Sequence, residues 1–176
     1  MAAIYRKLTL RDPLDAGAWR LLGSALLRML QFDEAQAALN RSLEINPVQT
    51  TAPGLLGMAY LLEDKPAAAL ESYERSSSDT FRRFGRALIY PALGRSEEAV
   101  EALAQLISKD GETAAFQIAA VYAVRGDKDQ AFAWLERARA QHDGGITVLK
   151  SEPILRSLHG DPRWTALLEK LHLPLD

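Results

Sequence analysis

The side chains best suited to chemistry in this chain are three histidines and a run of serines. His142, His159 and His172 could bind a metal or carry a proton, but none has a second histidine three or four residues further on, as a helical metal pair would. The run Ser76-Ser77-Ser78-Asp79 could offer a nucleophile, yet its composition is typical of a turn after a short helix. We therefore interpret the histidines as solvated residues and the serines as a turn.

Recognised catalytic signatures are also missing from the sequence. It contains no GxSxG, no GxxxxGK[ST] and no GxGxxG after a strand, which are the motifs that position a nucleophile or cradle phosphates. The absence of cysteine excludes thiolate metal sites and disulfides. We expect a protein that is not an enzyme and that uses no cofactor and no metal.

Composition and charge restrict the classes of partner. The 176 residues are 48% hydrophobic and 25% charged, which is near the average for globular domains. A net charge of -2 gives no general attraction to nucleic acid or to an anionic membrane. No stretch is apolar enough for a membrane span, and the N-terminus lacks the apolar centre of a secretory signal. We predict a cytoplasmic protein that binds neither nucleic acid nor membrane.

A repeated helical pattern runs along the chain. Alanine and leucine are abundant, while proline and glycine fall at intervals, which indicates medium-length helices joined by short turns. The same order of large, small and aromatic residues recurs about every 34 residues. The four copies contain Trp19, Leu22, Gly23, Leu26, Ala35, Leu39 and Ser42; then Leu56, Gly57, Tyr60, Ala69, Tyr73 and Ser76; then Tyr90, Gly94, Ala99, Leu103 and Leu106; and then Ile118, Ala119, Tyr122, Gly126, Ala131, Leu135 and Ala138.

This period and pattern resemble the tetratricopeptide-repeat (TPR) family. The resemblance implies an all-α fold, a right-handed TPR α-solenoid of stacked antiparallel helix pairs. The expected units are a lone N-terminal helix as a half repeat at 1–13, repeats at 16–49, 50–79, 80–111 (degenerate) and 112–145, and C-terminal capping helices at 146–176.

Small residues at fixed places predict close contacts between paired helices. Gly23 and Gly57 would let each first helix approach Ala35 and Ala69 of the second helix, because a larger side chain would overpack the contact. Trp19 is expected to be a buried knob in the first repeat. Pairing of this kind would bury a continuous core along the array.

The two ends depart from the repeat. Residues 1–13 correspond to a second helix without its first, so we expect that the chain was cut from a longer array or has lost an upstream domain; the alternative is a native N-terminal cap. An uncapped end exposes apolar surface, which predicts weak homo-oligomerisation through it. After the fourth repeat the period dissolves, and Asp161-Pro162 begins a last helix that either caps the array or folds into the groove as an internal ligand.

The C-terminal stretch is also similar to the TPR tails of bacterial cyclases, kinases and winged-helix regulators. The residues that carry this similarity are Ala131, Phe132, Trp134, Leu135, Glu136, Pro153, Leu158, Asp161, Pro162, Arg163, Trp164, Leu167 and Leu168, while His159-Gly160 depart from the usual pair. This resemblance implies a bacterial signalling context. An alternative function is therefore a regulatory or oligomerisation segment of a larger bacterial enzyme or transcription regulator, packed against its own or a neighbouring subunit.

The preferred function is a protein-protein interaction scaffold. In TPR proteins the first helices line a concave groove, and the matching residues here are Arg20, Ser24, Leu27, Arg28, Met58, Leu61, Leu62, Arg82, Arg86, Phe116, Ala120 and Val124. An apolar groove with a basic strip suits a protein or peptide partner, in particular an acidic-amphipathic one.

The phase of the third repeat stays open from sequence. One phase faces Phe81, Phe84 and Leu88 to the groove and buries Arg83 and Arg86. The other buries the phenylalanines with Leu88 and turns Arg82 and Arg86 outward, and it is favoured because burying unpaired arginines is costly.

Overall fold

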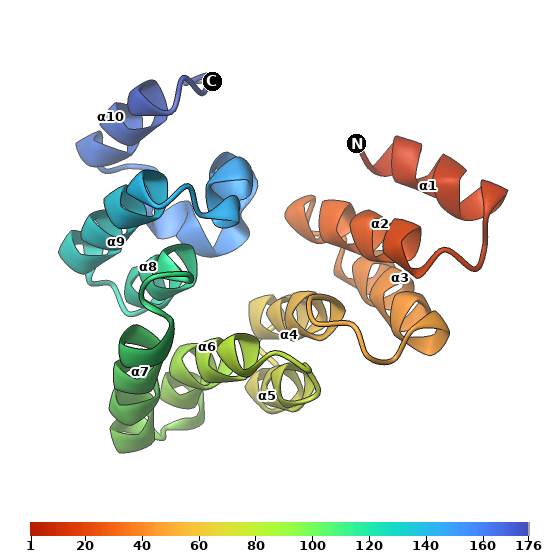
Figure 1. Ribbon diagram of the computed structural model, residues 1–176, viewed down its shortest axis with the longest axis horizontal. Coiled ribbons are helices and arrows are strands. Elements are labelled where there is room, and N and C mark those ends of the chain that lie inside the picture. The colour runs from red at the N-terminus through yellow and green to blue at the C-terminus, as the bar shows by residue number, and fades with distance from the viewer. Residues whose placement is uncertain (176) are drawn as a thin grey trace. The chain divides into compact units, whose positions relative to one another are not determined.

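The structure is a computed structural model that describes residues 1–175, and within them every regular element is helical (Figure 1). The predicted all-α solenoid class of paired helices is confirmed. The helices group into two compact units, Met1–Ala99 and Val100–Asp176.

The first unit contains a lone helix followed by two helical hairpins and a further helix. Its elements are α1 (Ala2–Arg11), α2 (Ala16–Arg28), α3 (Phe32–Ile45), α4 (Ala52–Leu62), α5 (Pro66–Glu74), α6 (Asp79–Ile89) and the 3₁₀ helix η1 (Tyr90–Leu93). Helices α2 and α3 form one hairpin and α4 and α5 the next, while α1 packs on α2, α3 on α4, and α5 on α6.

The second unit is built around one hairpin and the segment that follows it. Helix α7 (Ser96–Asp110) crosses the boundary between the units, and α8 (Ala115–Val124) pairs with α9 (Lys128–Ala140). Two 3₁₀ helices, η2 (Gly144–Ser151) and η3 (Pro153–Leu158), then pack on α8, and α10 (Pro162–Lys170) ends the described fold.

Glycines bring the paired helices of the first unit together. A Cβ atom added to Gly57 would lie 2.5 Å from the Tyr73 ring and 2.9 Å from the Ala69 carbonyl oxygen. A Cβ atom added to Gly23 would lie 2.6 Å from the Leu39 side chain and 3.1 Å from the Ala35 carbonyl oxygen. The predicted close approach of each first helix to its second helix is therefore confirmed.

The turns before α3, α5, α7 and α9 each contain one residue in the left-handed backbone region. Gly94 and Gly126 have φ angles of 72° and 78°, as their positions in the repeat predict. Leu30 and Asp64 have φ angles of 59° and 58°, although their Cβ atoms disfavour this region. The turn geometry is therefore kept even where the sequence does not supply a glycine.

A buried serine closes each of the first two hairpins. The Ser42 hydroxyl donates to the carbonyl oxygen of Ala16 at 2.6 Å, and the Ser76 hydroxyl donates to that of Thr50 at 2.7 Å. Both bonds join the end of a second helix to the segment that precedes or begins its own first helix. Ser76, from the serine run, therefore has a structural role.

The third repeat follows the phase that packs Phe84, Gly85 and Leu88, although Phe81, which was predicted to pack with them, is only half-buried. Phe84, Gly85 and Leu88 of α6 are buried, and a Cβ added to the glycine would lie 2.4 Å from Tyr73 in α5. Arg82 and Arg86 are only half-buried. This phase avoids placing charged groups in the core.

The C-terminal segment continues the spacing of the repeat, which the sequence did not reveal. Ser157 in η3 donates to the carbonyl oxygen of Ala123 in α8, and Arg163 in α10 pairs with Asp129 in α9 at 2.6 Å. The two residues of each pair are 34 positions apart. The segment thus occupies the place of a further hairpin whose first helix is replaced by 3₁₀ turns, and those turns lack the helical periodicity that a sequence search detects.

Candidate functional site

Helix α2 carries four of the predicted groove residues, and they divide into two kinds. Ser24 and Leu27 are buried, with exposed fractions of 8% and 2%, whereas Arg20 and Arg28 are half-buried. Arg28 donates from Nη1 to the Ser24 carbonyl oxygen at 3.1 Å and to its hydroxyl at 2.5 Å. The buried pair therefore belongs to the packing, and the arginines form the accessible part of this face.

The α2 arginines have hydrogen-bonding capacity to spare. Within residues 1–175 neither Arg20 nor Arg28 forms an ion pair, and the buried Nε of Arg28 has no acceptor. A guanidinium group has five N–H donors and binds a carboxylate through two parallel hydrogen bonds. A carboxylate of a partner protein would supply the acceptor and the negative charge that these two arginines lack.

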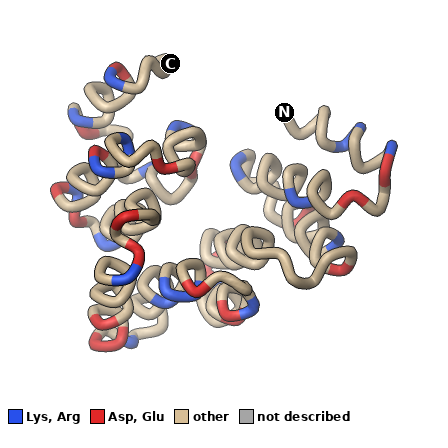
Figure 2. The backbone as a smooth tube through the Cα atoms, in the orientation of Figure 1, with Lys and Arg blue, Asp and Glu red and all other residues tan. Residues whose placement is uncertain are grey.

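Helix α4 contacts α2 and presents an uncharged surface. Its sequence contains no charged residue, as the uninterrupted tan tube in Figure 2 shows. Met58 is buried, at 7% exposure, but Leu61 and Leu62 are half-buried. A helix that is apolar on all sides is normally covered, so these partly open leucines are candidates for contact with a partner. We call Arg20, Arg28, Leu61 and Leu62 the α2–α4 face.

The predicted arginines of α6 are engaged within the first unit. Arg86 forms two hydrogen bonds with the Glu74 carboxylate, at 2.6 and 2.8 Å, and they raise the pKa of Arg86 above its usual value despite partial burial. Arg82 pairs with Asp79 and donates to the Ser76 carbonyl oxygen. The sequence could not reveal the bond with Glu74, because it depends on how α5 and α6 pack. These two arginines therefore have less capacity for a partner than those of α2.

The predicted groove residues of α8 are mostly covered by the chain itself. Phe116 and Ala120 are buried, at 7% and 2% exposure, and Val124 is 47% exposed. Gly145 of η2 lies on the Phe116 ring, since an added Cβ would be 2.2 Å from it, and the Phe116 N–H donates to Asp143 at 3.0 Å. The apolar helix α8 is thus covered by η2 and η3, whereas Leu61 and Leu62 of α4 are only half-buried.

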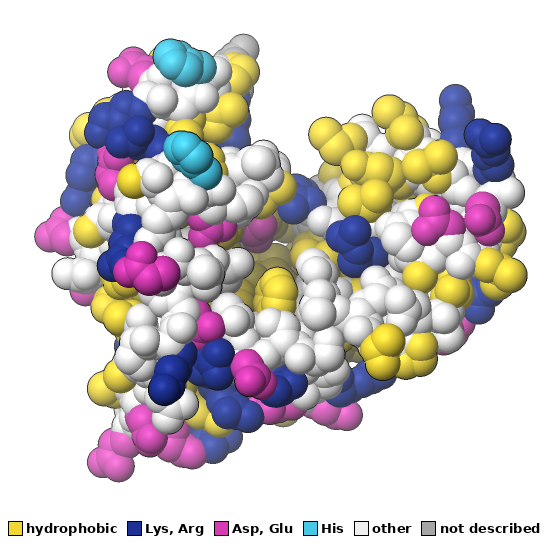
Figure 3. All heavy atoms as spheres, viewed as in Figure 1, with side chains coloured by type: hydrophobic (Ala, Val, Ile, Leu, Met, Phe, Trp, Pro, Cys, Tyr) yellow, Lys and Arg dark blue, Asp and Glu magenta, His cyan; other side chains and the backbone are white. Residues whose placement is uncertain are grey.

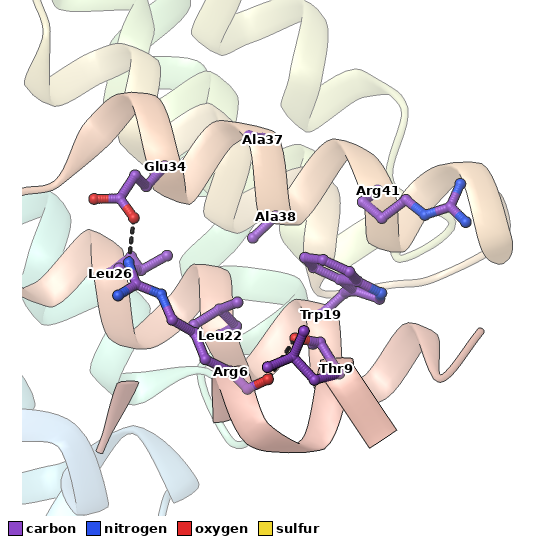
Figure 4. A pocket seen from close by; sticks show the side chains of 10 residues that line it. Arg6, Thr9, Trp19, Leu22, Leu26, Glu34, Ala37, Ala38 and Arg41 are labelled. Atoms are coloured by element: carbon purple, nitrogen blue, oxygen red, sulfur yellow. Dashed lines mark hydrogen bonds and ion pairs between the residues drawn. The ribbon is translucent and has the colours of Figure 1, made fainter. Parts of the chain in front are cut away.

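A groove that the sequence did not indicate lies between α1 and α3, above α2 (Figure 4). We call it the N-terminal groove; it encloses about 540 Å³ and is lined by Arg6, Thr9, Leu10, Trp19, Leu22, Leu26, Glu34, Ala37, Ala38 and Arg41. The expectation that Trp19 is a buried knob is wrong. The indole is half-buried at the groove, and its Nε1 donates to the Pro13 carbonyl oxygen at 3.0 Å.

The structure adds no catalytic feature in the part of the chain that it describes. Within residues 1–175, no group of three His, Asp or Glu side chains is placed to hold a metal ion. The three histidines are exposed, and His159 stacks on Trp164 with ring centroids 4.4 Å apart. Partial burial lowers the pKa of His159.

None of the described helices is both long and apolar enough to pass through a membrane.

Comparison with known proteins gives a consistent result. The sequence profile described as "Tetratricopeptide repeat" matches residues 22–79 and 84–146, more than half of the chain. A crystal structure of MamA is similar with a TM-score of 0.56 at 20% identity, covering 83% of this chain and 89% of that chain. YrrB, described as a TPR protein with an unusual peptide-binding site, gives 0.56 at 16% identity, covering 98% and 100%.

A chain of the Cut9-Hcn1 hetero-tetramer of APC/C gives a TM-score of 0.60 at 15% identity, covering 96% of this chain and 34% of that chain. No curated protein sequence matches this one. At sequence identities this low, similarity to these structures is evidence for the fold alone.

Proposed function

This chain belongs to the tetratricopeptide-repeat family, and from that premise we propose that it is a protein-interaction scaffold, not an enzyme, which binds a segment of a partner protein on the α2–α4 face. The observation that carries the proposal is the pair of α2 guanidinium groups without a carboxylate partner, on a helix that contacts the charge-free α4. A peptide-binding site in YrrB, a protein of similar fold, supports this class of function.

The chemistry of the face defines the partner. Arg20 and Arg28 favour carboxylates, and the guanidinium group of Arg28 has an unused N–H donor that gives a directional contact. Leu61 and Leu62 offer apolar area to aliphatic or aromatic side chains. The partner is therefore an acidic-amphipathic helix or extended peptide, held near micromolar affinity, or about -8 kcal/mol. We propose the cytoplasm as the compartment of the protein.

The other predicted groove residues have secondary places in this proposal. Ser24, Leu27 and Met58 lie beneath the face and shape it from within the packing. Arg82 and Arg86 contribute charge that is already shared with acidic neighbours. Phe116, Ala120 and Val124 of α8 belong to the second unit and are not part of the α2–α4 face; η2 and η3 pack on their helix.

Peptide selection on the intact chain tests the proposal. Displayed random peptides that bind the chain should be enriched in Asp, Glu and large apolar residues, and should bind an Arg20→Ala/Arg28→Ala variant at least about tenfold more weakly, or 1.4 kcal/mol. An Arg75→Ala/Lys109→Ala variant removes two exposed cations elsewhere and serves as the control. Equal circular dichroism spectra ensure that folding is unchanged. Selected peptides that bind all three proteins equally would exclude the α2–α4 face.

A second candidate function is a regulatory or oligomerising segment of a larger bacterial signalling protein. It is favoured by exposed apolar side chains on and beside α1, because such a patch is typical of a contact surface. Met1 is 87%, Ile4 62%, Leu10 80% and Leu14 70% exposed. Sedimentation over a range of concentrations tests the oligomerising form, since mass should rise with concentration and Ile4→Glu should abolish the rise. A mass independent of concentration would count against it.

A further inference from the structure

In the first unit, the contact between α1 and α2 and the contact between α3 and α4 lie 34 residues apart in the sequence but are packed with different side chains. Where α3 meets α4, a cluster of Leu39, Leu43, Ala52 and Leu56 is buried, with Leu55 and Tyr60 packed against it. Thirty-four residues earlier, where α1 meets α2, the corresponding residues are Tyr5, Thr9, Ala18, Leu22, Leu21 and Leu26. Five of these six keep an apolar or aromatic side chain. Only Thr9, in the place of Leu43, does not.

Thr9 leaves space where Leu43 fills it. Its side chain is shorter, and its hydroxyl donates to the Arg6 carbonyl oxygen in its own helix at 3.0 Å. Thr9 is 5% exposed and, together with Leu22 and Leu26 of α2, forms the floor of the N-terminal groove. The groove therefore lacks an aliphatic side chain at the position that Leu43 fills in the next repeat.

The walls of the groove suit a helix. On α3 the lining residues include Ala37 and Ala38 (Figure 4), whose small side chains allow another backbone to come near. They lie between Glu34 and Arg41, a length of about 10 Å or two helical turns. Trp19, fixed by its bond to the Pro13 carbonyl oxygen, offers a rigid aromatic surface beside them.

Two arginines and one glutamate line the groove. Arg6 comes from α1, whose sequence has two further cations and no acidic residue, and Arg41 and Glu34 come from α3. Glu34 pairs with Arg6 across the groove, and Glu44 pairs with Arg41 at 2.9 Å, but all four side chains are 41–64% exposed, and such pairs contribute little and exchange easily. Figure 3 shows hydrophobic side chains gathered over these N-terminal helices beside the cations. The combination matches an apolar ridge flanked by carboxylates.

We propose that the N-terminal groove binds an amphipathic helix of a partner protein, which inserts an aliphatic side chain where Leu43 sits in the next repeat and places carboxylates against Arg6 and Arg41. The site is separate from the α2–α4 face, and the proposal does not depend on that face. The position of Leu43 in the next repeat indicates that the inserted side chain is aliphatic. The cations at the groove indicate that the partner helix carries carboxylates beside that side chain.

A fluorescent peptide of about 15 residues, with leucines at helical positions i, i+3, i+4 and i+7 and glutamates elsewhere, is the probe. Its binding to the full chain is measured by fluorescence anisotropy. Thr9→Leu fills the groove from within, so affinity should fall at least about tenfold while the melting temperature rises. A loss of binding in a more stable protein cannot be attributed to unfolding.

Charge is tested separately. Arg6→Glu/Arg41→Glu should also weaken binding at least about tenfold, whereas Lys109→Glu, which changes an exposed cation on α7, should leave it unchanged. Because the probe is acidic and amphipathic, it can also bind the α2–α4 face, so its affinity is measured in an Arg20→Ala/Arg28→Ala background as well. The loss caused by Thr9→Leu should persist in that background, which distinguishes failure here from failure of the proposed function.

Three results would overturn the inference. The first is equal affinity of the parent chain and Thr9→Leu for the probe. The second is equal binding of a peptide with lysine in place of glutamate. The third is self-association of the parent chain that Thr9→Leu abolishes, because the occupant would then be a second copy of this chain.

Discussion

The junction between α1 and α2 and the junction between α3 and α4 differ chiefly in one buried position. Both place a second helix against the following first helix at the same spacing, and Ala18 and Ala52 are buried at equivalent places. The second junction is filled by Leu43, and the first is left open at Thr9. A repeat protein can therefore keep its backbone spacing and still create a binding groove by shortening one side chain.

The largest expected effect comes from truncating the same leucine in each junction. Leu56→Ala should lower the free energy of unfolding by about 3–4 kcal/mol, because it removes a buried side chain from a filled cluster. Leu22→Ala should cost less, about 2 kcal/mol, because Leu22 already borders a cavity and has fewer contacts to lose. Urea unfolding followed by circular dichroism measures both. Equal costs would mean that the first junction is as well packed as the second.

Exchanging the deciding residue should convert one junction into the other. Leu43→Thr should cost about 2 kcal/mol, because it removes buried methyl groups and brings a hydroxyl into an apolar cluster. The reverse change, Thr9→Leu, should stabilise the chain by about 1 kcal/mol through cavity filling. If Thr9→Leu destabilised the protein in the same urea experiment, the groove would be too narrow for a leucine.

The turns of the two hairpins allow a smaller comparison. Leu30 and Asp64 occupy equivalent left-handed positions, and leucine is the less suited to that backbone. Leu30→Gly should stabilise the protein by about 1 kcal/mol, and Asp64→Gly by about half as much. Thermal unfolding of the two variants gives the order, and a larger gain at Asp64 would contradict it.

The two ends of the chain should also differ in their response to acid. Asp161 caps α10 and accepts hydrogen bonds from the Arg163 side chain and N–H, which lower its pKa from 3.8 to about 2, whereas the cap of α1 makes no side-chain bond. Because the folded pKa lies below the unfolded one, this contribution to stability is present above the unfolded value and is lost as pH falls through about 2. Melting temperatures of Asp161→Asn should therefore depend less on acid than those of the parent. Parallel acid curves would exclude this role.

Local rules predicted a large part of the fold. Gly23 and Gly57 reveal the helix contacts because only glycine fits there, and Asp161 reveals the start of α10 because it caps the helix. Side chains whose partners lie on another element were harder to place. Trp19 was expected to be buried, but its indole lines the N-terminal groove and donates to the Pro13 carbonyl oxygen.

The candidate site was predicted less well than the fold, for a related reason. The register of a first helix indicates which residues face one side, but it does not show what covers that side. Phe116 lies under Gly145 because the segment after α9 forms 3₁₀ turns, and Arg86 turns to Glu74 because α5 and α6 pack together. Arg20 and Arg28 form no ion pair within residues 1–175, and their part in a binding site stays a prediction.

The most direct test of the account is the affinity of one selected acidic-amphipathic peptide for the parent chain and for Arg20→Ala/Arg28→Ala, measured by isothermal titration at equal helicity. The proposed scaffold function predicts a dissociation constant near micromolar for the parent and at least about tenfold weaker binding by the variant. The same affinity for both proteins would show that the α2–α4 face is not where the partner binds.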